Sequence, residues 1–178
     1  VPEVPGIARY QYNRPGRPQV GDNKKARKVF EQAYHYHKLN QLDEAIMSYQ
    51  KVLMLDPGFQ QAHLNSAIAY HSKGKFKKAL PRYELALAIN PLSRESRYSF
   101  AQSLHRENFY VDAAREFEKL IEVYETYLPG HLELAIIYAG KLQMPDRANV
   151  HYRRVLELNP QHPEATVIRE WLLANNRP

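Results

Sequence analysis

The chain has 178 residues, of which 44% are hydrophobic and 25% are charged, a balance typical of a globular domain. It contains no cysteine, which excludes disulfides, cysteine-ligated zinc and thiol nucleophiles. No apolar stretch is long enough for a membrane span or a signal peptide, so we expect a soluble protein. A chain whose targeting segment had been removed would look the same, which leaves the cytoplasm and the periplasm or exterior open.

The formal net charge of +6 is concentrated in two places. Residues 1–25 hold five basic and two acidic residues, and residues 60–93 hold five basic and one acidic residue. Most of the second excess is a basic patch formed by Lys73, Lys75, Lys77 and Lys78. Nucleic-acid-binding proteins more often spread lysine and arginine along a whole face. Binding of RNA or an acidic membrane through these two places is therefore the less favoured alternative.

Residues 1–24 are predicted to form an extended, proline-rich arm or linker. They contain four prolines and three glycines and show little hydrophobic periodicity, as in segments that favour polyproline II geometry. Aromatic and basic residues of the arm, among them Arg9, Tyr10 and Tyr12, could dock on a surface. Two interpretations stay open: a mobile tether, and a segment that packs along the rest of the chain or along a second copy.

From residue 26 onward the sequence repeats every 34 residues. Alanines recur at two positions of the repeat, first as Ala33, Ala67, Ala101 and Ala135, then as Ala45, Ala79, Ala113 and Ala148. An aromatic residue follows each alanine of the second set four residues later: Tyr49, Tyr83, Phe117 and Tyr152. Alanine lets two helices approach closely, and an aromatic residue one turn later fills the space beside the contact. The spacing therefore predicts pairs of packed helices.

The ends of the predicted helices carry matching turn residues. Asn40, Gly74 and Asn108 occupy equivalent positions between two helices, and glycine and asparagine best tolerate a left-handed backbone there. Three repeats close with a proline, which keeps the residue before it out of helical geometry: Pro57, Pro91 and Pro160.

With these residues the chain resembles the tetratricopeptide-repeat family over residues 26–162. The resemblance implies an all-α fold, a right-handed superhelix of antiparallel helix hairpins known as an α-solenoid. Within a domain of residues 25–178 we expect repeats at about 26–59, 60–93, 94–127 and 128–162. A capping helix is expected at residues 163–175, with Trp171 as a packing residue.

Two features depart from the regular pattern. Pro81 lies inside the second helix of the second repeat and is predicted to kink or shorten it. In the fourth repeat ten residues separate Tyr138 from Ala148, whereas nine separate Tyr36 from Ala45, so one residue is inserted. Pro145 and Asp146 are predicted to start the second helix of that repeat.

The resemblance also implies that the first helix of each hairpin lines a concave groove. The family's groove positions correspond to Arg27, Phe30, Tyr34, His37, Gln61, Leu64, Asn65, Ile68, His71, Tyr98, Ser99, Gln102, His105, Leu132, Glu133 and Ile136. An apolar and aromatic stripe with polar edges predicts the binding of a helix or extended peptide of a partner protein. The alternative is that some of these residues are ordinary core, or are covered by the arm.

Three of the groove residues, His37, His71 and His105, are themselves 34 residues apart. We interpret them as polar side chains that hydrogen-bond a peptide backbone or water, with a pH-sensitive ladder as an alternative. A metal site is disfavoured, because neighbouring helix axes lie about 8–10 Å apart whereas zinc ligands lie about 2.1 Å from the ion.

No catalytic triad, paired carboxylates, metal cluster or glycine-rich phosphate loop is recognisable, so the sequence predicts neither an enzyme nor a cofactor. The resemblance implies a protein-interaction scaffold that acts as an adaptor or assembly factor in a larger complex. Self-assembly through the arm and a non-catalytic role in an enzyme complex are the alternatives. Some family members clamp the C-terminal carboxylate of chaperones, but of those clamp residues only Asn65 is matched, so this ligand is not expected.

Overall fold

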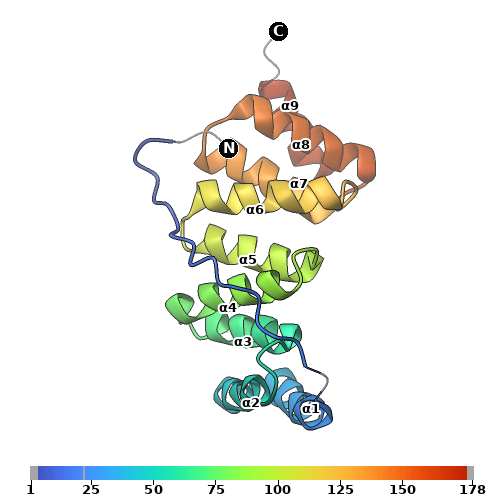
Figure 1. The fold of residues 1–178 in the computed structure, drawn as a ribbon. Helices are drawn as coiled ribbons and strands as arrows, with labels where there is room; N and C mark the ends of the chain where they lie inside the picture. Colours follow the sequence, from blue (N-terminus) through green and yellow to red (C-terminus); the bar gives the residue numbers. More distant parts are fainter. Residues whose placement is uncertain (1–3, 22, 176–178) are drawn as a thin grey trace. The chain divides into compact units, whose positions relative to one another are not determined.

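The computed structural model describes residues 4–21 and 23–175, and there the chain is an extended segment followed by α-helices joined by short turns (Figure 1). The predicted all-α helical-repeat solenoid is confirmed. Residues 1–3 and 22 of the predicted arm lie outside the described residues. No helix in the described part is both long enough and apolar enough to cross a membrane.

The helices divide into two compact units. The N-terminal unit comprises Gln11–Ser103, and the C-terminal unit comprises Leu104–Pro178 together with Val1–Tyr10. The boundary falls near the end of one helix, α5 (Arg94–Arg106).

In the N-terminal unit, α5 is preceded by α1 (Lys24–Lys38), α2 (Leu42–Leu55), α3 (Gln60–Ser72) and α4 (Phe76–Ile89). Helix α1 packs on α2, and α3 packs on both α2 and α4. Because α3 has neighbours on several sides, it buries residues around most of its circumference, including Ala62, Leu64, Ala67 and Tyr70.

The C-terminal unit contains α6 (Tyr110–Val123), α7 (Leu128–Ile136), the π-helical turn η1 (Ile137–Lys141), α8 (Pro145–Leu158) and α9 (Ala165–Ala174). Helix α7 packs on α6 and α8, and α9 packs on α8. Pro145 is the first residue of α8 and Asp146 lies in its first turn, as predicted. The ring centroids of Trp171 in α9 and Tyr152 in α8 lie 4.9 Å apart, so Trp171 is a packing residue.

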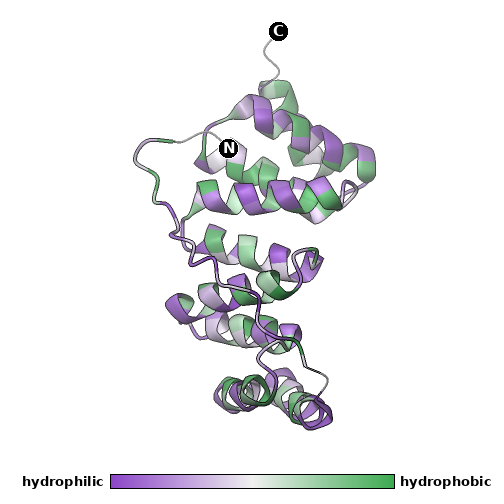
Figure 2. Cartoon of the chain, in the orientation of Figure 1, coloured by the Kyte–Doolittle hydropathy of each residue, from purple (hydrophilic) through white to green (hydrophobic). Residues whose placement is uncertain are grey.

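The repeated alanines form the closest contacts of the core. All eight are 0% exposed. Of the aromatic residues one turn later, Tyr49, Tyr83 and Phe117 are at most 2% exposed, whereas Tyr152 is half-buried. Each helix accordingly carries both hydrophobic and hydrophilic residues, the pattern of a helix with one buried face (Figure 2).

The hairpin turns have the predicted left-handed residues. The φ angles of Asn40, Gly74 and Asn108 are 57°, 67° and 64°. The residue after each of them donates its backbone N–H to the carbonyl five residues earlier, at 2.9 Å. This is the Schellman arrangement, which satisfies carbonyls at a helix C-terminus.

The inserted residue of the fourth repeat is absorbed at the end of α7. There the chain widens into the π-helical turn η1, which accommodates one extra residue per turn. Met144 N–H donates to the carbonyl of Tyr138, six residues earlier, at 2.8 Å, and Gln143 takes the left-handed position with φ 52°. The turn to α8 therefore follows the same plan with one residue added.

The prediction that Pro81 shortens its helix is wrong. Helix α4 has 14 residues, as do α2 and α6. Pro81 removes one backbone donor, but Ala79, Leu80 and Tyr83 beside it are buried. Tertiary packing of this face holds the helix together across the missing hydrogen bond.

Candidate peptide-binding site

The predicted groove residues of the N-terminal unit differ widely in exposure. Arg27, Tyr34 and Gln61 are exposed, whereas Leu64 is 1% exposed. Leu64 is therefore core, because α3 is enclosed by its neighbours, and no ligand reaches it. The half-buried residues are Phe30, His37, Asn65, Ile68, His71, Tyr98, Ser99 and Gln102. In the C-terminal unit His105, Leu132 and Glu133 are half-buried and Ile136 is 37% exposed.

An aromatic cluster marks the face of α1. The ring of Phe30 stacks on that of Phe59 at 4.9 Å and on that of Tyr34 at 6.3 Å, measured between centroids. Phe30 packs against the core, whereas Tyr34 is 45% exposed and has the ammonium group of Lys38 4.9 Å from its ring centroid. Tyr34 is thus the part of this cluster that another molecule can contact.

The three evenly spaced histidines are engaged within their own hairpins. His37 Nδ1 lies 3.1 Å from the hydroxyl of Tyr49, and burial lowers the pKa of His37. The ring of His71 meets Phe76 edge-on at 5.0 Å. In the C-terminal unit, His105 Nδ1 lies 3.6 Å from a carboxylate oxygen of Glu133. Each histidine therefore supports the end of a hairpin as well as facing outward.

The basic patch is partly neutralised. Lys73 Nζ lies 2.5 Å from Asp43 Oδ2, and this hydrogen bond lowers the pKa of Asp43. Lys78 Nζ lies 5.9 Å from the ring centroid of Tyr70. Lys75 and Lys77 are exposed. Two of the four lysines thus interact with side chains of the N-terminal unit, which reduces the charge offered to a polyanion.

The arm packs on the N-terminal unit through Glu84 of α4, which is 6% exposed. Glu84 Oε1 accepts from the side-chain amide of Asn13 at 2.9 Å, and Oε2 accepts from the backbone N–H of Arg14 at 2.8 Å. Arg14 has a left-handed backbone with φ 50°. The ring of Tyr12 meets that of Phe100 edge-on at 6.0 Å. One carboxylate and one aromatic ring therefore hold this part of the arm.

A second contact involves Asp56, which is 4% exposed at the end of α2. Its Oδ1 accepts the backbone N–H of Gly21 at 3.1 Å and of Gly58 at 3.0 Å. A Cβ atom on Gly58 would lie 2.4 Å from both the carbonyl oxygen of Gln19 and the Cα of Val20. Gly58 thus lets the arm backbone touch the turn between α2 and α3.

In the C-terminal unit the first part of the arm is held by Asp112 of α6, whose side chain is 0% exposed. The guanidinium of Arg9 donates to both carboxylate oxygens, at 3.0 and 2.8 Å, and the backbone N–H of Tyr10 donates at 2.8 Å. The ring of Tyr10 lies 5.6 Å from that of Phe109. In each unit, then, buried carboxylates accept backbone N–H groups of the arm, which favours the packed arm over the mobile tether.

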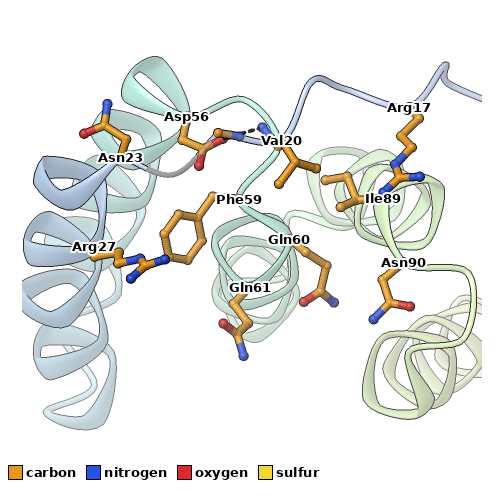
Figure 3. A pocket seen from close by; sticks show the side chains of 12 residues that line it. Arg17, Val20, Asn23, Arg27, Asp56, Phe59, Gln60, Gln61, Ile89 and Asn90 are labelled. Atoms are coloured by element: carbon orange, nitrogen blue, oxygen red, sulfur yellow. Dashed lines mark hydrogen bonds between the residues drawn. The ribbon is translucent and has the colours of Figure 1, made fainter.

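A cavity of about 540 Å³ lies beside the arm in the N-terminal unit (Figure 3). The arm contributes Arg17 and Val20 to its wall, α1 contributes Arg27, and the end of α4 contributes Ile89. Phe59, Gln60 and Gln61 line it from the start of α3, and Asn90 from the residue after α4. The structure thus brings two predicted groove residues, Arg27 and Gln61, together with two arm residues.

A pair of histidines lies inside the C-terminal unit. His131 Nδ1 lies 3.1 Å from His151 Nδ1, and His131 Nε2 donates to the backbone carbonyl of Glu125 at 3.0 Å. Because His131 uses its proton on Nε2, its Nδ1 must accept from His151 when both rings are neutral. Burial, and then the nearby His131, lower the pKa of His151 to about 4. The evenly spaced groove histidines gave no indication of this pair.

Two family models match the chain, one described as TPR repeat over residues 33–74 and one as tetratricopeptide repeat over residues 62–95. The chain is a tetratricopeptide-repeat protein. Tetratricopeptide repeats are in general non-catalytic scaffolds for protein interaction, and that general description applies to this chain. Comparison with curated proteins finds no match.

Solved structures of other tetratricopeptide-repeat solenoids are similar. MamA residues 41-end from Desulfovibrio magneticus RS-1 is 14% identical with a TM-score of 0.72, over 87% of this chain and 95% of that chain. A tetratricopeptide repeat protein from Parabacteroides merdae is 17% identical with a TM-score of 0.79, over 86% and 60%. A structure titled for Pseudomonas aeruginosa pilF is 17% identical with a TM-score of 0.69, over 86% and 78%. At these identities the similarity shows the fold alone.

The replacement Gly58→Ala is expected to release the arm from the turn between α2 and α3. The new Cβ would overlap arm backbone, and overpacking of this kind typically costs 1–3 kcal/mol, so we expect about tenfold faster amide exchange at Val20 and Gly21. Hydrogen exchange measured by NMR checks this. Gly16→Ala is the matched control, because a Cβ there meets nothing within 4 Å. Equal exchange in Gly58→Ala and the wild type would show that the arm is not held at this point.

Proposed function

We propose that the chain is an adaptor that binds a peptide segment of a partner protein along the first-helix face of the N-terminal unit. One observation carries this proposal: with the arm docked, Arg27, Tyr34 and Gln61 of that face are still exposed. The alternative in which the arm covers these three groove residues is therefore not favoured.

The chemistry of this face suits a peptide. Tyr34, supported from below by Phe30, offers an aromatic surface for an apolar side chain. Half-buried Asn65 and exposed Gln61 offer amides that can pair with a peptide backbone. The N-terminal unit also holds its own arm in extended form by hydrogen bonds to backbone N–H groups, which supports the capacity to bind extended chain.

The replacement Tyr34→Ala is expected to weaken peptide binding about tenfold, in the range of an aromatic contact at the centre of an interface. Its ring is 45% exposed, so the fold should persist. The probes are peptides selected on the full chain from a displayed random library, with dissociation constants measured by fluorescence anisotropy.

Met54→Ala is the matched control, because Met54 on α2 is 82% exposed and lies outside the first-helix face. It should leave the dissociation constants unchanged. Selected peptides that bind Tyr34→Ala as tightly as the wild type would contradict the proposed site.

A further inference from the structure

The cavity between the arm and the helices of the N-terminal unit is not explained by the arm contacts. We propose that it receives an acidic side chain of the partner peptide, and that the docked arm forms one wall of this subsite. The inference rests on the proposed function and adds the chemistry of one ligand residue to it.

Two arginines define the electrostatics of the cavity. Arg17 lines it from the arm and Arg27 lines it from α1, so the guanidinium groups come from different walls (Figure 3). Asp56 also lines the cavity, but it is 4% exposed and its Oδ1 already accepts the N–H groups of Gly21 and Gly58. The charge that faces a ligand is therefore positive, which selects a carboxylate.

The remaining lining fits an aspartate or glutamate side chain. A guanidinium group presents paired N–H donors that match the two oxygens of a carboxylate. Gln61 and Asn90 are exposed and carry amide donors, whereas the amide of Gln60 already donates to Ser96 at 2.6 Å. Phe59, Val20 and Ile89 provide apolar surface for the methylene groups. A volume of about 540 Å³ holds one such side chain with its surrounding water.

The arm matters because it carries Arg17 and Val20. The backbone of Gln19 and Val20 lies against Gly58, so displacement at Gly58 removes the arm wall of the cavity. Peptide binding and arm docking then strengthen each other, as reciprocal linkage requires. An arm that merely competed with the partner would have the opposite effect, since its release would strengthen binding.

The test uses the full chain and the selected library peptides. We expect aspartate or glutamate to be enriched at one peptide position, and a synthetic peptide with glutamate there to bind about fivefold more tightly than its glutamine analogue, as for a partly exposed ion pair. Arg17→Ala, Arg27→Ala and Gly58→Ala should each bring this ratio close to one. Lys24→Ala, which removes a charge from α1 outside the cavity lining, should keep it.

The outcomes separate this inference from the proposed function. Equal binding of both peptides, with Tyr34→Ala still weakening both, would overturn the acidic subsite and leave the proposed function standing. Tighter binding by Gly58→Ala would overturn the arm wall and show the arm to be a competitor. Failure to select any peptide on the wild-type chain would overturn both.

Discussion

Replacing Phe117 with alanine is expected to destabilise the C-terminal unit by about 3–5 kcal/mol, the usual cost of deleting a fully buried aromatic side chain. Phe117 is 0% exposed, and its deletion leaves a cavity beside Ala113, which is equally buried. Urea unfolding followed by circular dichroism measures the total loss. Hydrogen exchange of amides in α6 and α7 assigns the loss to this unit, which is necessary because the chain has two compact units.

Tyr152→Ala is the matched comparison, because Tyr152 occupies the same repeat position one repeat later. Its ring is half-buried and contacts Trp171, so we expect a loss of about 1–2 kcal/mol. Equal losses in the two variants would show that repeat position rather than burial sets the energy.

Acidification from pH 7 to pH 4 is expected to destabilise the C-terminal unit by about 2–3 kcal/mol through His151. The pKa of His151 is about 4 in the folded chain and about 6.5 in an unfolded one, because burial disfavours the charged ring. Between these values the unfolded chain binds a proton that the folded chain does not, so stability falls as pH falls. The full gap of about 2.5 pKa units corresponds to roughly 3 kcal/mol at 1.36 kcal/mol per unit, and the partial exposure of the ring reduces it.

The variant His151→Gln isolates this effect. Its side-chain amide can still donate to His131 Nδ1 but does not titrate between pH 4 and 7. Hydrogen exchange of α8 amides, measured in both proteins across this range, should show a pH dependence of stability in the wild type that is largely absent in the variant. The same slope in both proteins would assign the acid sensitivity to other groups.

The packed arm changes how the proposed scaffold should be tested. Because Glu84 and Asp56 hold the arm on the N-terminal unit, a truncation that removes it would expose two buried carboxylates as well as the cavity. Point replacements such as Gly58→Ala and Arg17→Ala separate these effects. They are therefore the more informative variants for mapping a partner.

The repeat pattern was sufficient to predict the hairpins, because helix packing at close range depends on local and periodic features. Alanine at a helix contact and a left-handed residue in a turn act within a few residues, and both are found where predicted. The effect of Pro81 was predicted wrongly in one respect, because the packing around α4 outweighs the loss of one hydrogen bond. Leu64 shows the same limit, since its burial depends on how many neighbours α3 has.

A recurrent contact between successive repeats was present in the sequence but not recognised. His63, Arg97 and His131 are 34 residues apart, and each donates to the backbone carbonyl six residues earlier, at 2.9, 2.6 and 3.0 Å. The acceptors belong to Pro57, Pro91 and Glu125. Because only the carbonyl takes part, Glu125 can replace the closing proline without loss of this hydrogen bond.

The sequence by itself determined the all-α repeat architecture, the hairpin turns and the family, since each of these is encoded in spacings of a few residues that recur every 34. Only the tertiary structure decided where the arm lies. Its contacts join Arg14 to Glu84 and Gly21 to Asp56, pairs that are far apart in the chain and follow no period. The cavity beside the arm exists for the same reason, because Arg17 and Arg27 come to share it only once the arm is docked.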